Sequence, residues 1–171
     1  MLQKLLTYVI LWLSIQLLAD CQLVPKQRES HTATYIDNKL YILGGNLPDN
    51  FTFHLNDFFY LDVSGPFNTK SLSWQDLSRN TTIPPHYGAT TVVGGVNNNT
   101  LFLYGGYSYD VTMALVYAFD PINKTWSIPN VPDEIFRRRN LIGINSNGKC
   151  IYGVDFWQME LLQTICLFLI R

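Results

Sequence analysis

Two stretches of the chain share a pattern of strand, turn and strand that ends in a pair of glycines. The first runs from Ser30 to Gly45 around a turn at Asp37–Lys39, and the second runs from Gly88 to Gly106 around a longer turn at Gly94–Thr100. β-Branched and aromatic residues flank both turns, which favours short paired strands. A glycine pair leaves room for another backbone or a large ring, because no Cβ is in the way. The sequence therefore predicts a repeated hairpin unit.

The match continues beyond each glycine pair. Phe58–Asp62 corresponds to Leu115–Asp120, and after a variable loop Trp74 corresponds to Trp126. Each unit thus contains four short strands connected by turns rich in Asn, Asp and Gly. Prolines lie between the units, where no ladder donor is needed: Pro84, Pro85, Pro129 and Pro132. The two full units span residues 28–79 and 84–130.

A third, partial unit is predicted over residues 137–155. The unit begins at Arg137, turns at Asn147-Gly148 and returns through Cys150–Tyr152, but Val154 stands where a second glycine is expected. Residues 156–171 form a hydrophobic tail that matches nothing earlier. Two interpretations of this tail stay open: the product of a truncated or misassembled reading frame, and a short helix that covers an open edge.

These residues resemble the kelch repeat of the galactose oxidase and kelch-like superfamily. Four antiparallel strands at this spacing are typical of a propeller blade, and the hairpin that ends in Gly44-Gly45 or Gly105-Gly106 is the distinctive part. The resemblance implies an all-β, kelch-type β-propeller, incomplete, with two full blades and part of a third. It also implies that Trp74 and Trp126 lie on the fourth strand of their blades and pack between blades.

The first 21 residues differ from the rest and predict a signal peptide. Lys4 precedes an apolar run from Leu5 to Leu18, and small and polar residues follow at Ala19–Gln22. Cleavage is expected after Ala19 or after Cys21. The run is shorter than the about 20 residues of a membrane span, so membrane attachment is expected only if the signal stays uncleaved. Residues 22–155 then form the repeat region.

Four Asn-x-Ser/Thr sequons without a central proline follow this segment. Together with a signal peptide they predict a secreted glycoprotein. The candidate glycosylation sites are Asn50, Asn80, Asn98 and Asn123. Two cysteines beyond the signal, Cys150 and Cys166, either pair in an oxidising compartment or remain buried thiols. The formal net charge of −1 offers no basic field for a nucleic acid.

No catalytic, cofactor or metal site is predicted. His31, His54 and His86 are separated in sequence and are expected in different contexts, His54 in a loop, with no ligand spacing for a metal. Asp62 and Asp120 end equivalent strands, which is typical of turn capping. Arg137–Arg139 begins the third unit and is interpreted as a repeat feature, because Arg is common there in the kelch family.

The remaining functional candidates are aromatic residues in the longer loops, because propeller loops project from a rigid scaffold and commonly carry function. These loops are 46–56, 64–71 and 107–113. Exposed aromatic side chains are favoured at protein interfaces. The candidates are Phe51, Phe53, Phe67, Tyr107 and Tyr109. The alternative is that several of them pack on neighbouring blades.

The sequence thus predicts a secreted kelch-repeat module that binds a protein or a glycan through its blade loops. Two alternatives stay open: a fragment of a galactose-oxidase-like copper enzyme that lacks its catalytic blades, and a truncated product without function. Closed propellers contain about 4–8 blades. An open arc exposes apolar faces and strand edges, so self-association is also expected.

Overall fold

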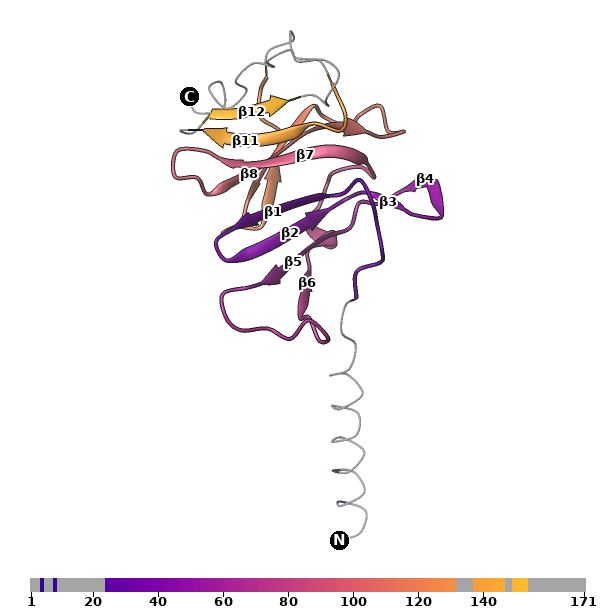
Figure 1. Cartoon of the computed structure of the whole chain (residues 1–171), viewed down its shortest axis with the longest axis vertical. Coiled ribbons are helices and arrows are strands. Elements are labelled where there is room, and N and C mark those ends of the chain that lie inside the picture. The colour runs from indigo at the N-terminus through magenta and orange to yellow at the C-terminus, as the bar shows by residue number, and fades with distance from the viewer. Residues whose placement is uncertain (1–3, 5–7, 9–23, 132–136, 147–148, 154–171) are drawn as a thin grey trace.

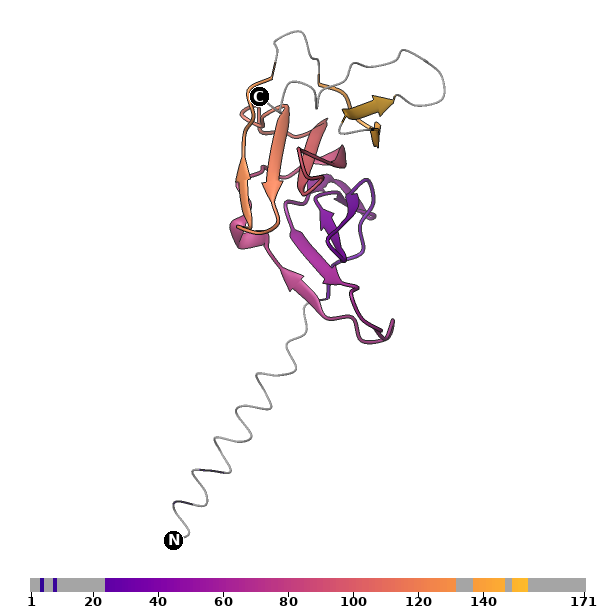
Figure 2. The same ribbon diagram turned by 90° about the vertical axis from the view of Figure 1, so that its left-hand side faces the viewer.

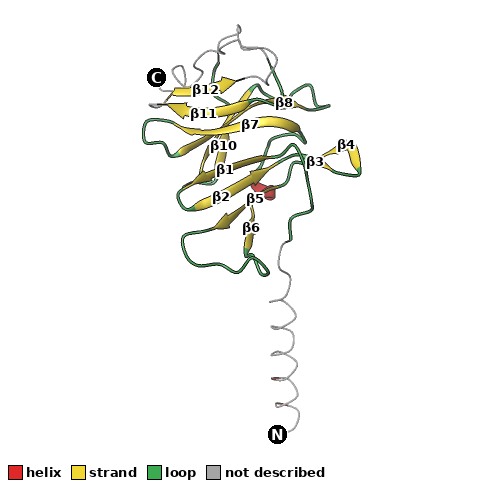
Figure 3. Cartoon of the chain, in the orientation of Figure 1, coloured by secondary structure: helices red, strands yellow, loops and turns green. Residues whose placement is uncertain are grey.

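The computed structural model describes residues 4, 8, 24–131, 137–146 and 149–153. Within these residues, two four-stranded antiparallel sheets lie side by side and a two-stranded hairpin follows (Figure 1). Strands dominate the described chain, and a short 3-10 helix, η1 (Ser78–Asn80), connects the two large sheets (Figure 3). The all-β class predicted from the repeat is confirmed.

The first sheet, called blade 1, has the spatial order β1-β2-β5-β6. Its strands are β1 (Thr32–Ile36), β2 (Lys39–Leu43), β5 (Phe58–Asp62) and β6 (Trp74–Asp76). The β1–β2 turn holds Asp37 and Asn38 at φ values of 48° and 57°. Tight hairpin turns need positive φ at both central positions, and Asp and Asn tolerate it better than most residues.

The second sheet, called blade 2, repeats this order as β7-β8-β9-β10. Its strands are β7 (Tyr87–Gly94), β8 (Thr100–Tyr107), β9 (Val116–Asp120) and β10 (Thr125–Ser127). The four strands predicted for each unit are therefore present. Asp62 and Asp120 cap the turns that follow β5 and β9, since each Oδ1 accepts a backbone N–H, from Ser64 at 2.9 Å and from Ile122 at 2.8 Å.

The third unit is a hairpin of β11 (Ile142–Ser146) and β12 (Lys149–Gly153). The segment 137–141 precedes the first strand and crosses blade 2, where the Asn140 N–H donates to the Gly88 carbonyl at 2.7 Å. The predicted tail, residues 156–171, lies outside the described residues.

A second departure from the sequence prediction lies between β2 and β5. The segment 46–56 was expected to be a loop, but it contains a small hairpin of β3 (Asn46–Leu47) and β4 (Asn50–His54). The Asn46 backbone pairs with Glu29 through two hydrogen bonds, which fixes the base of the hairpin. The first four residues of β4 are all exposed, so the apolar–polar alternation that marks a strand is missing there.

The larger buried cluster lies between the two blades, which are adjacent in Figure 2. Phe58 of β5 meets Phe119 of β9 edge to face at a centroid distance of 4.8 Å. Trp126 lies 5.3 Å from Phe58 and 4.9 Å from Phe119, so it contacts both blades, as its position on the fourth strand predicts. Trp74 has the equivalent position in blade 1 but packs edge to face on Phe59 of its own blade at 5.2 Å. Interblade packing was expected for Trp74 as well, but among the described residues its ring contact lies within its own blade.

The paired glycines stand where the next blade begins. Gly45 N–H donates to the His86 carbonyl and Gly106 N–H donates to the Arg138 carbonyl, both at 2.8 Å. A Cβ on Gly105 would lie 2.2 Å from the Arg138 carbonyl oxygen, and the φ of Gly105 is +72°. Only glycine satisfies both conditions without strain, so the close approach predicted for these pairs is confirmed.

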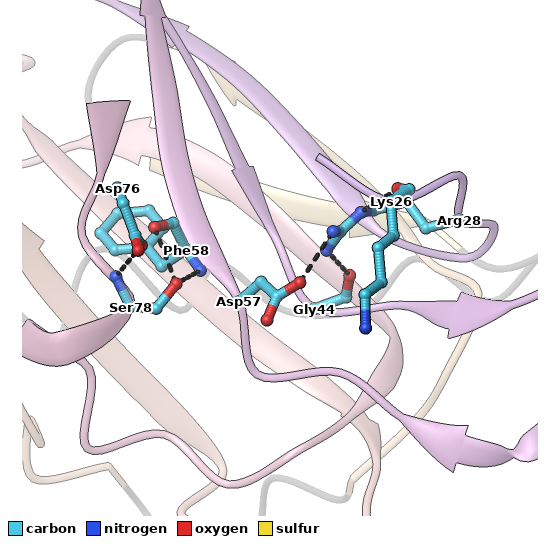
Figure 4. Close-up of polar contacts among 7 residues, drawn as sticks. All are labelled: Lys26, Arg28, Gly44, Asp57, Phe58, Asp76 and Ser78. Atoms are coloured by element: carbon cyan, nitrogen blue, oxygen red, sulfur yellow. Dashed lines mark hydrogen bonds and ion pairs between the residues drawn. The ribbon is translucent and has the colours of Figure 1, made fainter. Parts of the chain in front are cut away.

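Two arginines occupy comparable places beside these glycines. Arg28 donates to the Gly44 carbonyl at 3.2 Å and forms an ion pair with Asp57 at 2.9 Å (Figure 4). Arg137 donates to the Gly105 carbonyl at 3.2 Å. The interpretation of Arg137 as a repeat feature agrees with this arrangement, because its guanidinium donates hydrogen bonds to backbone carbonyls of blade 2.

Candidate interaction site

The connections that leave the two glycine pairs meet at one end of the blades. The β3–β4 hairpin belongs to blade 1 and the loop 107–113 belongs to blade 2. Between them lies a groove of about 320 Å³. Its lining comes from both connections and from the segment that enters β7: Thr52, Phe53, His54, Pro85, Ser108, Tyr109 and Asp110.

Backbone hydrogen bonds hold both sides of the groove. Leu55, which follows β4, donates to the Gly45 carbonyl at 2.8 Å and accepts from the His86 N–H at 3.1 Å. On the other side, the Ser108 hydroxyl donates to the Pro85 carbonyl at 2.7 Å. The two connections are therefore tied to the same segment before β7, and the groove between them is preformed.

An aromatic cluster surrounds His54, and two of its members, His54 and Tyr109, line the groove. The His54 ring stacks on Tyr109 with a centroid distance of 4.7 Å and an interplanar angle of 2°. Tyr87 lies 4.8 Å from His54, and Tyr107 meets the His54 ring edge to face at 5.8 Å. We call His54, Tyr87, Tyr107 and Tyr109 the His54 cluster. It joins residues of both blades and supports the part of the groove that His54 and Tyr109 line.

The pKa values of His54 and Asp110, which both line the groove, are shifted in the same direction. Burial lowers the pKa of His54 below 6.5, against a weaker opposing effect of its hydrogen bond to the Phe51 backbone. Hydrogen bonds from the Thr112 side chain and backbone lower the pKa of Asp110 below 3.8. At neutral pH the groove therefore contains a neutral imidazole and a charged carboxylate.

His86 lies fully buried beneath this site. Its Nδ1 is 2.8 Å from the Pro84 carbonyl oxygen, which requires the proton to be on Nδ1. Nε2 faces the position that a Cβ on Gly44 would take, and it has no hydrogen-bond partner among the described residues. Burial, with smaller effects of His54 and Arg137, lowers the pKa of His86 to about 4.

The expected separation of the three histidines is therefore wrong for two of them. His54 ends β4 and is buried, rather than lying in an open loop, and its charge would lower the pKa of His86. The connection before β5 folds back on the segment before β7, which brings the two residues near each other. Among the described residues, no group of three or more His, Cys, Asp or Glu side chains is placed to hold a metal ion.

The structure separates the five aromatic candidates into two places. Phe51 and Phe53 lie on β4, and Tyr107 and Tyr109 lie at the end of β8 and beyond it, all at the groove end of the blades. Phe67 lies in the β5–β6 connection, and the bond from Val63 N–H to the Asn38 carbonyl places this connection at the opposite end. The exposed fractions are 65% for Phe51, 53% for Phe53, 53% for Phe67, 39% for Tyr107 and 65% for Tyr109.

Sequence reasoning missed His54, Tyr87 and Asp110 as members of this site. Tyr87 begins a strand and carries no loop signal. Asp110 lies in a predicted loop, but only the fold shows that it faces β4. One sequence signal could have identified this site. The two connections that follow the glycine pairs are equivalent in the repeat, so they are expected at the same end of adjacent blades.

All four sequon asparagines are exposed in the structure. Asn50 Oδ1 accepts the Thr52 hydroxyl at 2.7 Å, and Asn98 lies in the β7–β8 turn, where it accepts from Asn145 at 2.8 Å. Asn80 ends η1, and Asn123 donates to Asp120 at 2.6 Å. Exposure makes these side chains accessible to modification, which remains a prediction.

Two other features bear on the sequence predictions. Cys166 and most of the segment 1–21 lie outside the described residues, so the disulfide and the signal peptide remain predictions. Within the part of the chain that the structure describes, no helix has the length and apolar character needed to cross a membrane.

Comparison with known proteins matches residues 13–170 to the KLHDC2/KLHL20/DRC7 Kelch-repeats domain. Kelch domain-containing protein 3 of Homo sapiens is 26% identical over 101 residues, which cover 58% of this chain and 26% of that protein. The protein of the same name from Mus musculus is 27% identical over the same length. Acyl-CoA-binding domain-containing protein 4 of Arabidopsis thaliana is 32% identical over 116 residues, 61% of this chain and 16% of that protein.

The chain thus spans about a quarter of the Kelch domain-containing protein 3 relatives that it matches. The family match runs through both four-stranded blades and the β11–β12 hairpin, and it agrees with the glycine pairs and the interblade Trp126. The chain therefore belongs to the KLHDC2/KLHL20/DRC7 Kelch-repeats domain family.

Proposed function

We propose that the chain is a protein-binding module whose partner docks in the groove between the β3–β4 hairpin and the loop 107–113. Kelch repeats generally mediate protein–protein interaction. The observation that carries the proposal is the convergence of exposed aromatic side chains from two blades on one preformed groove. Aromatic residues are enriched at the centres of protein interfaces, because they bury a large area with few rotatable bonds.

The test compares matched aromatic substitutions at the two ends of the blades. The double variant Phe53→Ala/Tyr109→Ala removes the exposed aromatic surface of the groove, whereas Phe67→Ala removes a ring of equal exposure at the other end. Proteins that co-purify with the wild-type chain are quantified by mass spectrometry. We expect partners to be lost with the double variant and retained with Phe67→Ala. Equal retention by both variants would refute the placement of the site.

We also propose that this module works in the secretory pathway and outside the cell. The proposal rests on the signal-like segment 1–21 and on four sequons whose asparagines are all exposed. N-terminal sequencing of the protein recovered from the medium of a eukaryotic host tests it. We expect a mature terminus that begins after Ala19 or Cys21, and an intact Met1 would contradict the proposal.

Self-association is proposed for the described blades. Tyr35 on the outer side of blade 1 and Ile142 and Ile144 on the outer side of β11 are exposed. Exposed apolar faces of this kind favour contact with similar faces of other molecules. Light scattering on a size-exclusion column measures the mass in solution, and a single monomeric peak would exclude self-association.

A further inference from the structure

We infer that the groove between the β3–β4 hairpin and the loop 107–113 binds a lysine or arginine side chain of its protein partner. This inference rests on the proposed function, because it assumes that the partner docks in this groove. It adds the chemistry of the contact, which follows from the charge of the lining and from the position of the exposed rings.

The lining of the groove contains an unpaired negative charge. Asp110 Oδ1 accepts the Thr112 N–H at 2.8 Å and the Thr112 hydroxyl at 2.6 Å. Within the described chain, no cation lies within ion-pair distance of Asp110, and Oδ2 accepts no hydrogen bond. Thr112 therefore fixes the carboxylate and leaves one of its oxygens available to a ligand.

No positive charge in the lining neutralises this carboxylate. His54, the one basic side chain of the lining, is neutral at neutral pH because burial lowers its pKa. Arg139 lies near the His54 cluster, but its guanidinium donates to the Tyr87 hydroxyl at 2.9 Å and is not part of the lining. The groove is consequently complementary to a cation.

Aromatic rings provide a second attraction for a cation. Tyr109 is fixed by its parallel stack on His54, so its exposed area belongs to the opposite ring face and the edge. Phe53 lines the same groove from β4. The face of an aromatic ring attracts a guanidinium or ammonium group. An arginine side chain can lie on these rings with its aliphatic part and reach Asp110 with its charged end.

Other occupants fit the groove less well. An apolar side chain would remove water from Asp110 without replacing its hydrogen bonds, which is unfavourable for a charged group. An acidic side chain would be repelled. A sugar ring stacks on aromatic faces and bonds to carboxylates, so an oligosaccharide is included in the test.

The probes are three octapeptides and one oligosaccharide, measured against the full chain by calorimetry and by NMR of the Tyr109 ring. The peptides consist of arginine, of citrulline, which has the shape of arginine without its charge, and of glutamate; the oligosaccharide is mannopentaose. We expect only the arginine peptide to bind and to shift the Tyr109 signals. Equal binding of the citrulline peptide, binding of mannopentaose alone, or no binding of the arginine peptide would overturn the inference.

Two matched acid substitutions locate the contact. Asp110→Asn keeps the shape of the side chain, removes its charge and should weaken binding of the arginine peptide by about tenfold or more. Because the substitution completes an Asn-x-Thr sequon with Thr112, all proteins of this comparison are produced in a bacterial host without N-glycosylation. Asp49→Asn removes an exposed charge from the β3–β4 turn, outside the lining, and should leave the affinity unchanged. Equal effects of the two substitutions would indicate general attraction to an acidic surface and would overturn the inference.

The two proposals fail in distinguishable ways. In one outcome, Phe53→Ala/Tyr109→Ala abolishes partner capture, whereas Asp110→Asn changes neither partner capture nor the affinity for the arginine peptide. The groove is then the docking site, but the inference that it binds a basic side chain is refuted. If the aromatic double variant retains all partners, the proposed function itself falls. A further variant, Tyr109→Leu, keeps the apolar area of the side chain but removes the aromatic ring. Its affinity for the arginine peptide should be lower than that of the wild type, because the cation–π contact is lost.

Discussion

The contact between Gly105 and the segment that enters β11 allows a sharp test of the double-glycine geometry. Gly105→Ala places a methyl group 2.2 Å from the Arg138 carbonyl oxygen at a residue with φ of +72°. Left-handed backbone costs a non-glycine residue about 1–2 kcal/mol. The clash is with backbone, so the segment itself must move, and an overpacked site costs about 1–3 kcal/mol.

The movement would also weaken the bond from Gly106 N–H to the Arg138 carbonyl, which is 2.8 Å long. We therefore expect Gly105→Ala to lower the free energy of unfolding by about 2–5 kcal/mol, a large part of the about 5–15 kcal/mol of a typical domain.

The assay is urea denaturation followed by tryptophan fluorescence, with Gly65→Ala as the matched control. Gly65 lies in an exposed loop, and a Cβ there would meet nothing within 4 Å. The control should unfold at the midpoint of the wild type, whereas Gly105→Ala should unfold at a clearly lower concentration. Equal midpoints for the two variants would show that the close approach at Gly105 does not constrain the fold.

Three further predictions concern the core, the buried histidine and the sequons. Trp126→Ala should lower the free energy of unfolding by about 3 kcal/mol or more, and Trp74→Ala by less, because only Trp126 has described ring contacts in both blades; equal urea midpoints would contradict this. The pKa of His86 is about 4 in the folded chain against 6.5 ordinarily, so the unfolded chain takes up its proton first as the pH falls. Stability should thus be fully present above pH of about 6.5 and decrease by up to about 3 kcal/mol towards pH 4; His86→Leu should flatten this dependence in urea titrations, and an unchanged slope would be evidence against it. At least two of the four exposed sequon asparagines should carry glycan in a eukaryotic host, Asn98 in particular, and treatment with an N-glycosidase that leaves the mass unchanged would refute this.

The sequence predicted the parts of the fold that repeat in it. Asp62 and Asp120 end matching strands in the same way, and Trp126 has the interblade position that its place in the unit implies. The β3–β4 hairpin was missed because the outward-facing residues at Asn50–Phe53 show no burial pattern. Its stability comes from the Glu29 backbone, which is distant in sequence.

The candidate site was predictable only in its aromatic residues. Tyr109 was identified from its loop, but its partner His54 comes from the other blade and from a connection of different length. No spacing in the sequence relates two such residues, so their stacking follows only from the packing of the blades. Asp110 belongs to the site because it lines the same groove as residues of β4, and a single sequence does not specify which residues share a groove.

The positions that open each unit share one backbone conformation, with consequences for how a disturbance spreads. Ser30, Gly88 and Asn140 have φ values of 53°, 64° and 57°. Gly88 N–H donates to the Ser30 carbonyl, and Asn140 N–H donates to the Gly88 carbonyl. β7 contacts β1 on one side and β11 on the other. The molecule is thus a quasi-one-dimensional array in which cooperativity passes from neighbour to neighbour.

In such an array, a defect in β7 uncouples the units on both of its sides, whereas a defect in β12 remains local. Blade 2 therefore couples the unfolding of blade 1 to the unfolding of the β11–β12 hairpin. Hydrogen exchange should show this order, since amides of β7 and β8 would open only when the array itself comes apart, and those of β11 would open earlier and independently.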